Sequence, residues 1–272
     1  MHTNKKQFSS SWAIILGGSS GFGLASIEKL ALHGMNIAVL YRETAAADRQ
    51  LKEKLTALAQ QNEVNIVPFN VNALEKTSRE SFIEQFKKNT GGEKCVKLLL
   101  HSIARGNLKP LILPGGEPEQ AAELSIEDIQ YTSYAMATSM LDWARAILNA
   151  GLFEPDARII GLTSEGAHKY WDGYAAVSVA KASLESLATY MAVELGKYGL
   201  KTNLVQAGIT ATPSLKKIPG SENLLKIAKE RNPLGRVTKP GDVANVIYLL
   251  CTDEAAWING SLIHVDGGEH CR

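Results

Sequence analysis

A tyrosine and a lysine seven residues apart, Tyr174 and Lys181, have the types and spacing that best suit chemistry. They lie in the stretch GYAAVSVAKASLESLATYMA, which has no proline and repeats apolar residues every three or four positions, so it is predicted to be a helix. At about 100° per residue, both side chains then lie on one face, two turns apart. The phenol would protonate or hydrogen-bond an oxyanion, and the nearby ammonium would lower its pKa. The alternative is a buried tyrosine beside a lysine that reaches solvent.

The composition narrows the kinds of partner to expect. With 272 residues, 45% of them apolar, the chain is long enough to bury a full core. Its 29 basic and 28 acidic residues give a net charge of +1, so no overall field attracts nucleic acid or a membrane surface. Three distant cysteines without a CxxC motif fit reduced thiols in a cytoplasmic protein. No histidine pair has metal-ligand spacing, and no apolar stretch has the length of a membrane span, so neither a metal nor a membrane is expected.

Apolar runs and helical periodicity alternate along the chain. The apolar runs predict strands at residues 12–16, 35–41, 64–69, 96–101, 158–163, 201–206 and 262–265. The periodic segments predict helices at residues 24–33, 45–61, 76–89, 126–150, 173–197 and 240–251. Because the strands are apolar on both faces, we expect an α/β fold in which one doubly wound parallel sheet has helices on both faces. We expect residues 1–272 to form a single domain.

The carboxyl edge of this predicted sheet gathers the candidate residues, because ligands bind there in doubly wound sheets. Irregular segments at 105–124 and 210–232 follow the fourth and sixth strands, and Ser164 follows the fifth. The turn GGSSGFG at 17–23 follows the first strand. Glycines there let the backbone approach a pyrophosphate, whose charge faces the free N–H groups of the next helix. A turn with a purely structural role is the alternative.

The combination of these motifs resembles the short-chain dehydrogenase/reductase family from about Ala13 to Gly268. The resemblance rests on GxxxGxG in the first turn, Tyr and Lys on a later helix, and a C-terminal VDGG. It implies a Rossmann-like fold, NAD(P)(H) binding and, usually, a homotetramer. Here Val177 occupies the usual tyrosine position of YxxxK, and the Yx6K spacing of Tyr174 and Lys181 resembles the enoyl-acyl-carrier-protein reductase branch. The segments HSI (residues 101–103), AKASLE and AGITAT are also similar to that branch.

The resemblance implies reduction of a trans-2-enoyl thioester at Cβ by hydride from NAD(P)H. Tyr174 would hydrogen-bond the thioester oxygen as an enolate develops, and Lys181 would grip the nicotinamide ribose. Ser164, 17 residues before Lys181, stands where the wider family has its catalytic serine. It is either a second donor to the substrate oxygen or the cap residue of its loop. Tyr170 and Trp171 would line an acyl pocket or simply pack.

Cofactor choice depends on the residue after the second strand, where an acid would select NADH. Arg42 stands there and suits a 2′-phosphate, which favours NADPH over NADH; the alternative is a surface arginine partly neutralised by Glu43. Asn70 replaces the family's usual adenine-binding Asp, and by resemblance Thr210 and Thr212 contact the carboxamide and phosphates. The residues expected to bind the nucleotide are Gly17, Ser19, Ser20, Gly21, Phe22, Gly23, Arg42, Asn70, Val71, His101, Ser102, Ile103, Lys181, Gly208, Thr210 and Thr212.

Residues 210–232 are expected to form a substrate lid. Its basic residues, Lys216, Lys217, Lys226, Lys229 and Arg231, outnumber its acidic ones, Glu222 and Glu230, and would meet an acidic carrier protein or form a solvated helix face. The sequence thus favours an NADPH-dependent enoyl-acyl-carrier-protein reductase of fatty-acid synthesis. The alternatives are a carbonyl or alcohol oxidoreductase of the same family, in which Ser164 governs the chemistry, and a non-catalytic NADP-binding regulatory protein.

Overall fold

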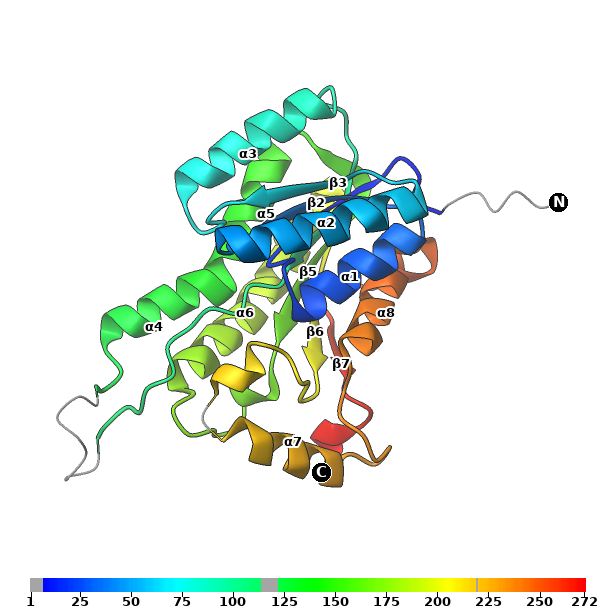
Figure 1. The fold of residues 1–272 in the computed structure, drawn as a ribbon. Coiled ribbons are helices and arrows are strands. Elements are labelled where there is room, and N and C mark those ends of the chain that lie inside the picture. The colour runs from blue at the N-terminus through cyan, green and yellow to red at the C-terminus, as the bar shows by residue number, and fades with distance from the viewer. Residues whose placement is uncertain (1–6, 114–121, 219) are drawn as a thin grey trace.

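The fold is a seven-stranded parallel sheet with helices on both faces (Figure 1). The structure is a computed structural model that describes residues 7–113, 122–218 and 220–272. The strands lie in the order β3-β2-β1-β4-β5-β6-β7. Their bounds are β1 Trp12–Leu16, β2 Asn36–Tyr41, β3 Ile66–Asn70, β4 Val96–His101, β5 Phe153–Thr163, β6 Leu200–Ala207 and β7 Leu262–Val265. This topology confirms the predicted Rossmann-like, doubly wound α/β fold.

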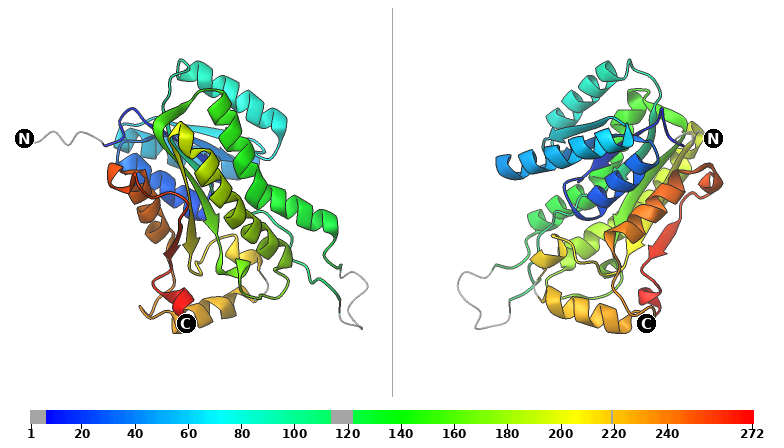
Figure 2. Two further views of the ribbon diagram at one scale, coloured as in Figure 1. Left: turned by 180° about the vertical axis from the view of Figure 1, so that it is seen from behind. Right: turned by 45° about the vertical axis from the view of Figure 1, so that its right-hand side comes forward.

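The helices divide between the two faces, and Figure 2 shows each layer from its own side. Their bounds are α1 Gly21–Leu32, α2 Ala45–Asn62, α3 Lys76–Asn89, α4 Ile126–Ser133, α5 Ser139–Asn149, α6 Ala175–Glu194, α7 Ser221–Arg231 and α8 Pro240–Cys251. Successive side chains of β1 enter opposite cores. Ile15 packs with residues of α1, α2 and α8, whereas Ile14 packs with residues of α3, α5 and α6. In the part of the chain that the structure describes, no helix is long and apolar enough to cross a membrane.

The two edge strands are less buried than the central ones, although β3 is apolar on both faces as predicted, with Ile66 packed on one core and Phe69 on the other. Each residue of β3 is at least partly exposed, and Leu262 and His264 of β7 are exposed. An edge strand has a neighbour on one side alone and incomplete helical cover, so its apolar content does not measure its burial. The central strands β2 and β4 are buried throughout, as expected.

Strand β5 begins at Phe153, earlier than the predicted residue 158. Its pairing with β4 is irregular between Val96 and Leu98, and a charged cluster fills this stretch. Asp156 accepts hydrogen bonds from Lys97, Arg158 and Lys201. The fully buried Arg158 also donates to the carbonyls of Leu250 and Thr252. Apolar patterning missed the start of the strand because ion pairs, not apolar contacts, hold these charges inside.

Three predicted helices differ from the observed ones by more than one residue at an end. The helix expected at 126–150 consists of α4, a π-helical turn at Tyr134–Thr138, and α5. The helix expected at 173–197 begins at Ala175, after Gly173 with φ of +64°, so that Tyr174 is its N-cap residue. It ends at Glu194 and is followed by a 3-10 turn at Gly196–Tyr198. Helix α1 begins at Gly21, inside the glycine turn and before the predicted residue 24.

The carboxyl ends of β1, β4, β5 and β6 meet at one edge of the sheet. The register pairs Leu16 with His101 and Thr163 with Gln206. Both irregular segments leave from this edge, although residues 114–121 and 219 of them lie outside the described residues, as do residues 1–6. Helix α7 lies at this edge beside the C terminus in both figures. The fold therefore brings the predicted site together.

Candidate active site

Tyr174 lies at the start of α6, with its ring packed on the turn that follows β5. That turn is the 3-10 segment Glu165–Ala167, and a Cβ at Gly166 would lie 2.5 Å from Cε1 of the Tyr174 ring. Only glycine allows this approach, because any side chain would displace the ring. Burial raises the pKa of Tyr174, and the Ser164 hydroxyl offsets part of this shift. The expected lowering of this pKa is therefore not found, since burial dominates.

Of the two alternatives left open by the sequence, the structure shows the cap role of Ser164, and its role as a donor to the substrate oxygen stays a prediction. Its Oγ accepts a hydrogen bond from the Gly166 amide at 3.2 Å, which caps the 3-10 turn. The same Oγ lies 3.5 Å from the Tyr174 hydroxyl, which donates to it. Because both contacts use Ser164 as acceptor, its own hydroxyl proton remains for a third partner. Ser164 is a cap residue and also the neighbour of the candidate acid.

Lys181 lies further along α6 with its ammonium buried below the same strand end. Its Nζ donates to the carbonyl of Leu162 at 2.7 Å, and the side chain is 6% exposed. Burial lowers its pKa to about 8, and the charge of Glu185 acts in the opposite direction. The alternative of a lysine that reaches solvent is wrong for this structure.

Glu185 is a site residue that sequence reasoning missed. Its carboxylate accepts a hydrogen bond from Thr163 Oγ1 at 2.6 Å and lies 2.7 Å from His168 Nε2. It follows Lys181 by four residues, and residues at this spacing are neighbours on a helix face. This spacing could have identified Glu185 from the sequence. Its contacts with Thr163 and His168 could not be predicted, because they depend on the tertiary fold.

The imidazole of His101 points into the core and not toward the open edge. Its Nε2 lies 2.8 Å from Oγ of Ser139, which in turn donates to the Ala135 carbonyl at 3.2 Å. Ser139 therefore accepts from His101, whose proton is on Nε2. Burial is the main cause that lowers the pKa of His101 to about 3, so the ring is neutral at physiological pH. Any contact of His101 with a nucleotide is left to its backbone.

The glycine turn packs closely against the segment after β4. A Cβ at Gly17, where φ is +87°, would clash with the carbonyl of Ser102, and a Cβ at Gly23 would clash with the carbonyl of Gly17. A Cβ at Gly21 would lie 3.4 Å from the Thr212 side chain. Ser20 is the N-cap residue of α1 but makes no side-chain capping bond. The backbone N–H groups of the first turn of α1 are thus left for an anion, and this arrangement fits the pyrophosphate of a dinucleotide.

The other predicted nucleotide residues lie in the glycine turn and at the carboxyl ends of β2, β3 and β4. Asn70 uses both ends of its amide on the backbone of Glu43, at 3.0 and 3.1 Å, and so holds the segment that carries the exposed Arg42. The backbone amide of Val71 donates to the Tyr41 carbonyl at 2.8 Å. Ser19 lies in the turn, and Phe22 and Ile103 pack partly buried against the two cores.

The segment after β6 carries three predicted residues. A Cβ at Gly208 would lie 2.5 Å from Thr238 Oγ1, so Gly208 packs inward. Thr210 is buried and its hydroxyl donates to the Gly208 carbonyl at 2.9 Å, whereas Thr212 faces the glycine turn. Thr212 Oγ1 also accepts the Leu215 amide at 3.2 Å. Thr212 is thus the member of this group that lies nearest the turn.

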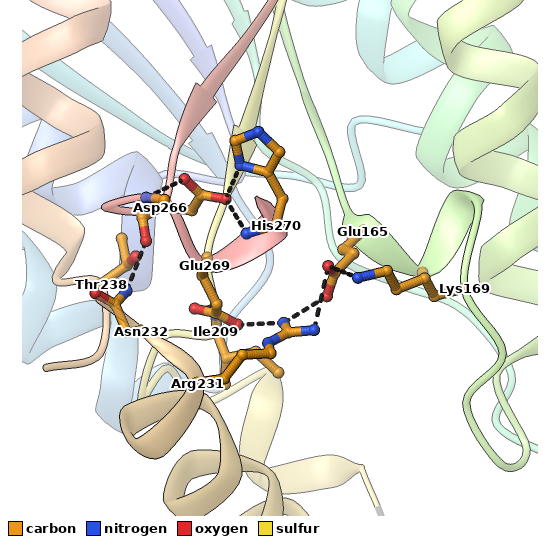
Figure 3. A network of polar contacts seen from close by, with 12 residues as sticks. Glu165, Lys169, Ile209, Arg231, Asn232, Thr238, Asp266, Glu269 and His270 are labelled. Atoms are coloured by element: carbon orange, nitrogen blue, oxygen red, sulfur yellow. Dashed lines mark hydrogen bonds and ion pairs between the residues drawn. The ribbon is translucent and has the colours of Figure 1, made fainter. Parts of the chain in front are cut away.

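Basic residues of the predicted lid fall into two sets. Lys216, Lys217, Lys226 and Lys229 are exposed. Arg231 instead contacts two carboxylates, Glu165 at 2.6 Å and Glu269 at 2.7 Å (Figure 3). Its assignment to a free positive surface is therefore wrong. Tyr170 is 88% exposed and Trp171 packs near Gly166, so of this pair Trp171 alone lies against the Tyr174 turn.

Comparisons with known proteins place this chain in a family. A family model described as enoyl-(acyl carrier protein) reductase matches residues 17–270. The chain is 29% identical over 252 residues to the enoyl-[acyl-carrier-protein] reductase [NADPH] FabI of Staphylococcus aureus (strain MRSA252), covering 93% of this chain and 92% of that protein. It is 28% identical over 242 residues to the [NADH] FabI of Bacillus subtilis (strain 168), covering 88% of each.

A solved structure has the same fold. The Bacillus cereus enoyl-acyl carrier protein reductase with NADP+ and indole naphthyridinone superposes with a TM-score of 0.83 at 24% identity, covering 98% of this chain and 99% of that one. The family match spans the glycine turn, the Tyr174–Lys181 helix and the C-terminal VDGG. The chain therefore belongs to the enoyl-(acyl carrier protein) reductase family of short-chain dehydrogenases/reductases and is an NAD(P)H-dependent oxidoreductase.

Proposed function

We propose that this protein reduces the trans-2-enoyl double bond of an acyl thioester with NADPH, on an acyl-carrier protein in fatty-acid synthesis. The observation that carries the proposal is the placement of the Tyr174 hydroxyl beside Ser164, above the buried ammonium of Lys181 at the carboxyl edge. The glycine turn lies at the same edge, because it follows β1. The two relatives reported above carry that activity in their names, one with NADPH and one with NADH.

The chain's residues would hold the nucleotide along this edge. The N–H groups at the start of α1 and the hydroxyl of Thr212 would receive the pyrophosphate, and Lys181 the nicotinamide ribose. Arg42 would face the 2′-phosphate that distinguishes NADPH from NADH, because a guanidinium pairs well with phosphate oxygens. When bound, NADPH supplies the hydride.

Tyr174 acts on the substrate oxygen. Negative charge grows on the thioester oxygen as the double bond is reduced, and the Tyr174 hydroxyl donates a hydrogen bond to it. Its raised pKa keeps the proton on the phenol at neutral pH, which a donor requires. Such a donor in a preorganised site contributes roughly 10²–10³-fold in rate.

Ser164 and Lys181 support the same oxyanion in different ways. The phenol has one proton, which passes from the Ser164 contact to the substrate oxygen when substrate binds. Ser164 Oγ keeps the Gly166 amide as its donor, so its own proton acts as a second donor to that oxygen. The ammonium of Lys181 is buried, so its positive charge acts through a low local dielectric. Each group thus lowers the energy of the developing anion without leaving its place in the fold.

The segment 210–232, including α7, would serve as the lid over the acyl chain. Its exposed residues Lys216, Lys217, Lys226 and Lys229 would face an acidic carrier protein. We further propose that the protein works in the cytoplasm as a homotetramer, on the family resemblance.

The test follows the absorbance of reduced nicotinamide with NADPH or NADH and a crotonyl thioester, on carrier protein and on coenzyme A. An acetoacetyl thioester is run beside it. Oxidation with the enoyl substrate, faster with NADPH and abolished in Tyr174→Phe, supports the proposal. Activity with the keto substrate alone would instead identify a carbonyl reductase.

One observation favours that second function. Ser164 stands where the wider family has its catalytic serine, and its Oγ lies 3.5 Å from a tyrosine hydroxyl, that of Tyr174. No oxidation with either substrate, while NADPH still binds, would favour the non-catalytic NADP-binding protein.

A further inference from the structure

We propose that Arg231 is a positioning residue that ties the closure of α7 to the shape of the turn behind Tyr174. The inference rests on the proposed function and deepens it, since it concerns how that same site is assembled. Arg231 is the last residue of α7. It lies between two carboxylates that come from distant parts of the chain.

The guanidinium joins these carboxylates as one unit, which we call the Arg231 clasp: Glu165, Arg231 and Glu269 (Figure 3). Its Nη1 and Nη2 contact Glu165 at 3.3 and 2.6 Å, and Nη2 also contacts Glu269 Oε1 at 2.7 Å. Lys169 contacts Glu165 at 2.6 Å from the other side. The Glu269 side chain is 2% exposed, so its charge depends on partners inside the protein.

One arm of the clasp reaches the candidate acid. Glu165 is the first residue of the 3-10 turn that Ser164 caps. The next residue, Gly166, packs against the Tyr174 ring so closely that a Cβ would lie 2.5 Å from it. A shift of Glu165 therefore moves the surface on which Tyr174 rests, and with it the hydroxyl that donates to the substrate.

The other arm reaches the segment that leads to the nucleotide. Glu269 Oε2 accepts a hydrogen bond from the Ile209 amide at 3.2 Å. Ile209 is followed by Thr210 and, two residues later, by Thr212, which lies against the glycine turn. The clasp thus connects α7, the Tyr174 turn and the Thr212 segment through one cation.

Arginine is suited to this task because its planar fork contacts two carboxylates at once, whereas a lysine offers a single point charge. With Arg231 neutralised, two largely buried carboxylates would face each other across the gap that it fills. Loss of both ion pairs would release the end of α7, and the repulsion between Glu165 and Glu269 would loosen the turn. Arg231 does not contact substrate in this account; it acts through Glu165 and Glu269.

The test compares Arg231→Gln and Arg231→Lys with Arg236→Gln in the full-length enzyme. Arg236 is a matched control because its ion pair is with Asp242 at the surface and not with Glu165 or Glu269. We expect Arg231→Gln to lower kcat for the crotonyl thioester by about 10- to 100-fold, as small misplacements of catalytic groups do. Arg231→Lys retains an intermediate kcat, and Arg236→Gln keeps the wild-type value. Equal kinetics in Arg231→Gln and Arg236→Gln would overturn the inference.

Hydrogen exchange supplies a readout that does not depend on turnover. Faster exchange is expected for amides of α7 and of residues 165–167 in Arg231→Gln, and not in Arg236→Gln. If the wild type fails to reduce enoyl thioesters yet this exchange difference appears, the proposed function fails and the clasp stands. Unchanged exchange, or faster exchange with unchanged kcat in an active enzyme, contradicts the positioning role.

A double-mutant cycle separates positioning from general destabilisation. Glu165→Gln combined with Arg231→Gln should lower kcat no further than Arg231→Gln alone, because both changes break the same link. A purely structural role predicts that kcat follows the fraction of folded protein, measured by thermal unfolding, in all four members of the cycle. Additive losses of kcat would overturn the clasp.

Discussion

The hydroxyl of Tyr174 lies 3.5 Å from Oγ of Ser164, and that same Oγ accepts the Gly166 amide at 3.2 Å. Because Ser164 Oγ is the acceptor in both contacts, its own proton is left for a third partner. The two contacts also place the phenol over the turn to which Arg231 is joined through Glu165. A substrate oxygen bound at this edge would take the single Tyr174 proton in place of Ser164 and would receive a second hydrogen bond from the Ser164 hydroxyl.

Removing the phenolic hydroxyl tests the first donor. Tyr174→Phe should lower kcat/KM for the enoyl thioester by roughly 10²–10³-fold, because the hydrogen bond acts mainly in the transition state. The dissociation constant for NADPH, measured by fluorescence titration, should remain at the wild-type value. Tyr170→Phe is the control, since that exposed hydroxyl contacts Asp172 and not Ser164. A fully active Tyr174→Phe enzyme would remove Tyr174 from the mechanism.

The buried ammonium of Lys181 predicts a pH dependence. Its pKa is lowered to about 8, so Lys181 is mostly protonated at pH 7 and loses its charge as pH rises through that value. Because kcat/KM reports the free enzyme, kcat/KM for NADPH should decline above about pH 8. Glu185→Gln removes the charge that raises this pKa and should move the decline to lower pH. A profile that stays level to pH 10, or the same inflection in Glu185→Gln, would contradict the assignment.

Sequence patterns predicted much of the fold, because many helices and strands are determined by their own residues. The bounds of β1, β4, α3, α8 and β7 agree with the predicted ranges, since each is an uninterrupted apolar run or helical period between turn residues. The prediction missed the start of β5 because Asp156 has the pattern of a surface residue until the fold brings Lys97 and Lys201 to it. The periodicity of the sequence did not predict the π-helical turn at Tyr134–Thr138.

The residues of the candidate site also separate into those that local sequence predicts and those that depend on the tertiary fold. The positions of Tyr174, Lys181 and Ser164 at one edge of the sheet could be predicted, because spacing on a helix and position after a strand are properties of the sequence, whereas their catalytic roles stay a prediction. The clasp could not, since Glu165, Arg231 and Glu269 are far apart in the chain and become neighbours only when α7 and the C-terminal turn meet. The inward orientation of His101 was equally hidden, because it depends on Ser139.

The charged start of β5 should govern part of the acid stability. Three cations lower the pKa of Asp156, so its contribution to stability is present above the ordinary carboxyl pKa and is lost as pH falls toward the lowered one. Asp156→Asn should reduce the free energy of unfolding at pH 7 by about 2 kcal/mol, less than for a fully buried pair because Asp156 is partly exposed. Urea unfolding at pH 7 and pH 3 measures the difference, which should shrink at pH 3. Glu80→Gln, at an exposed pair, should change little at either pH.

Arg42 should decide the nucleotide. It is exposed directly after β2, and Asn70 fixes the adjoining Glu43 by two hydrogen bonds, so the direction of this segment does not depend on the arginine itself. Arg42→Asp would place a carboxylate where a 2′-phosphate is expected, and like charges repel. We expect the ratio of kcat/KM for NADPH to that for NADH to fall at least about tenfold, which corresponds to about 1.4 kcal/mol.

Lys88→Asp is the matched control for Arg42→Asp. It makes the same change of charge at an exposed position in the last turn of α3, which leads back to the amino edge of the sheet. Both variants shift the net charge equally, so a long-range effect would appear in both, whereas recognition of the 2′-phosphate is lost in Arg42→Asp alone. A nucleotide ratio that moves by the same factor in the two variants would mean that Arg42 acts only through the overall field of the protein.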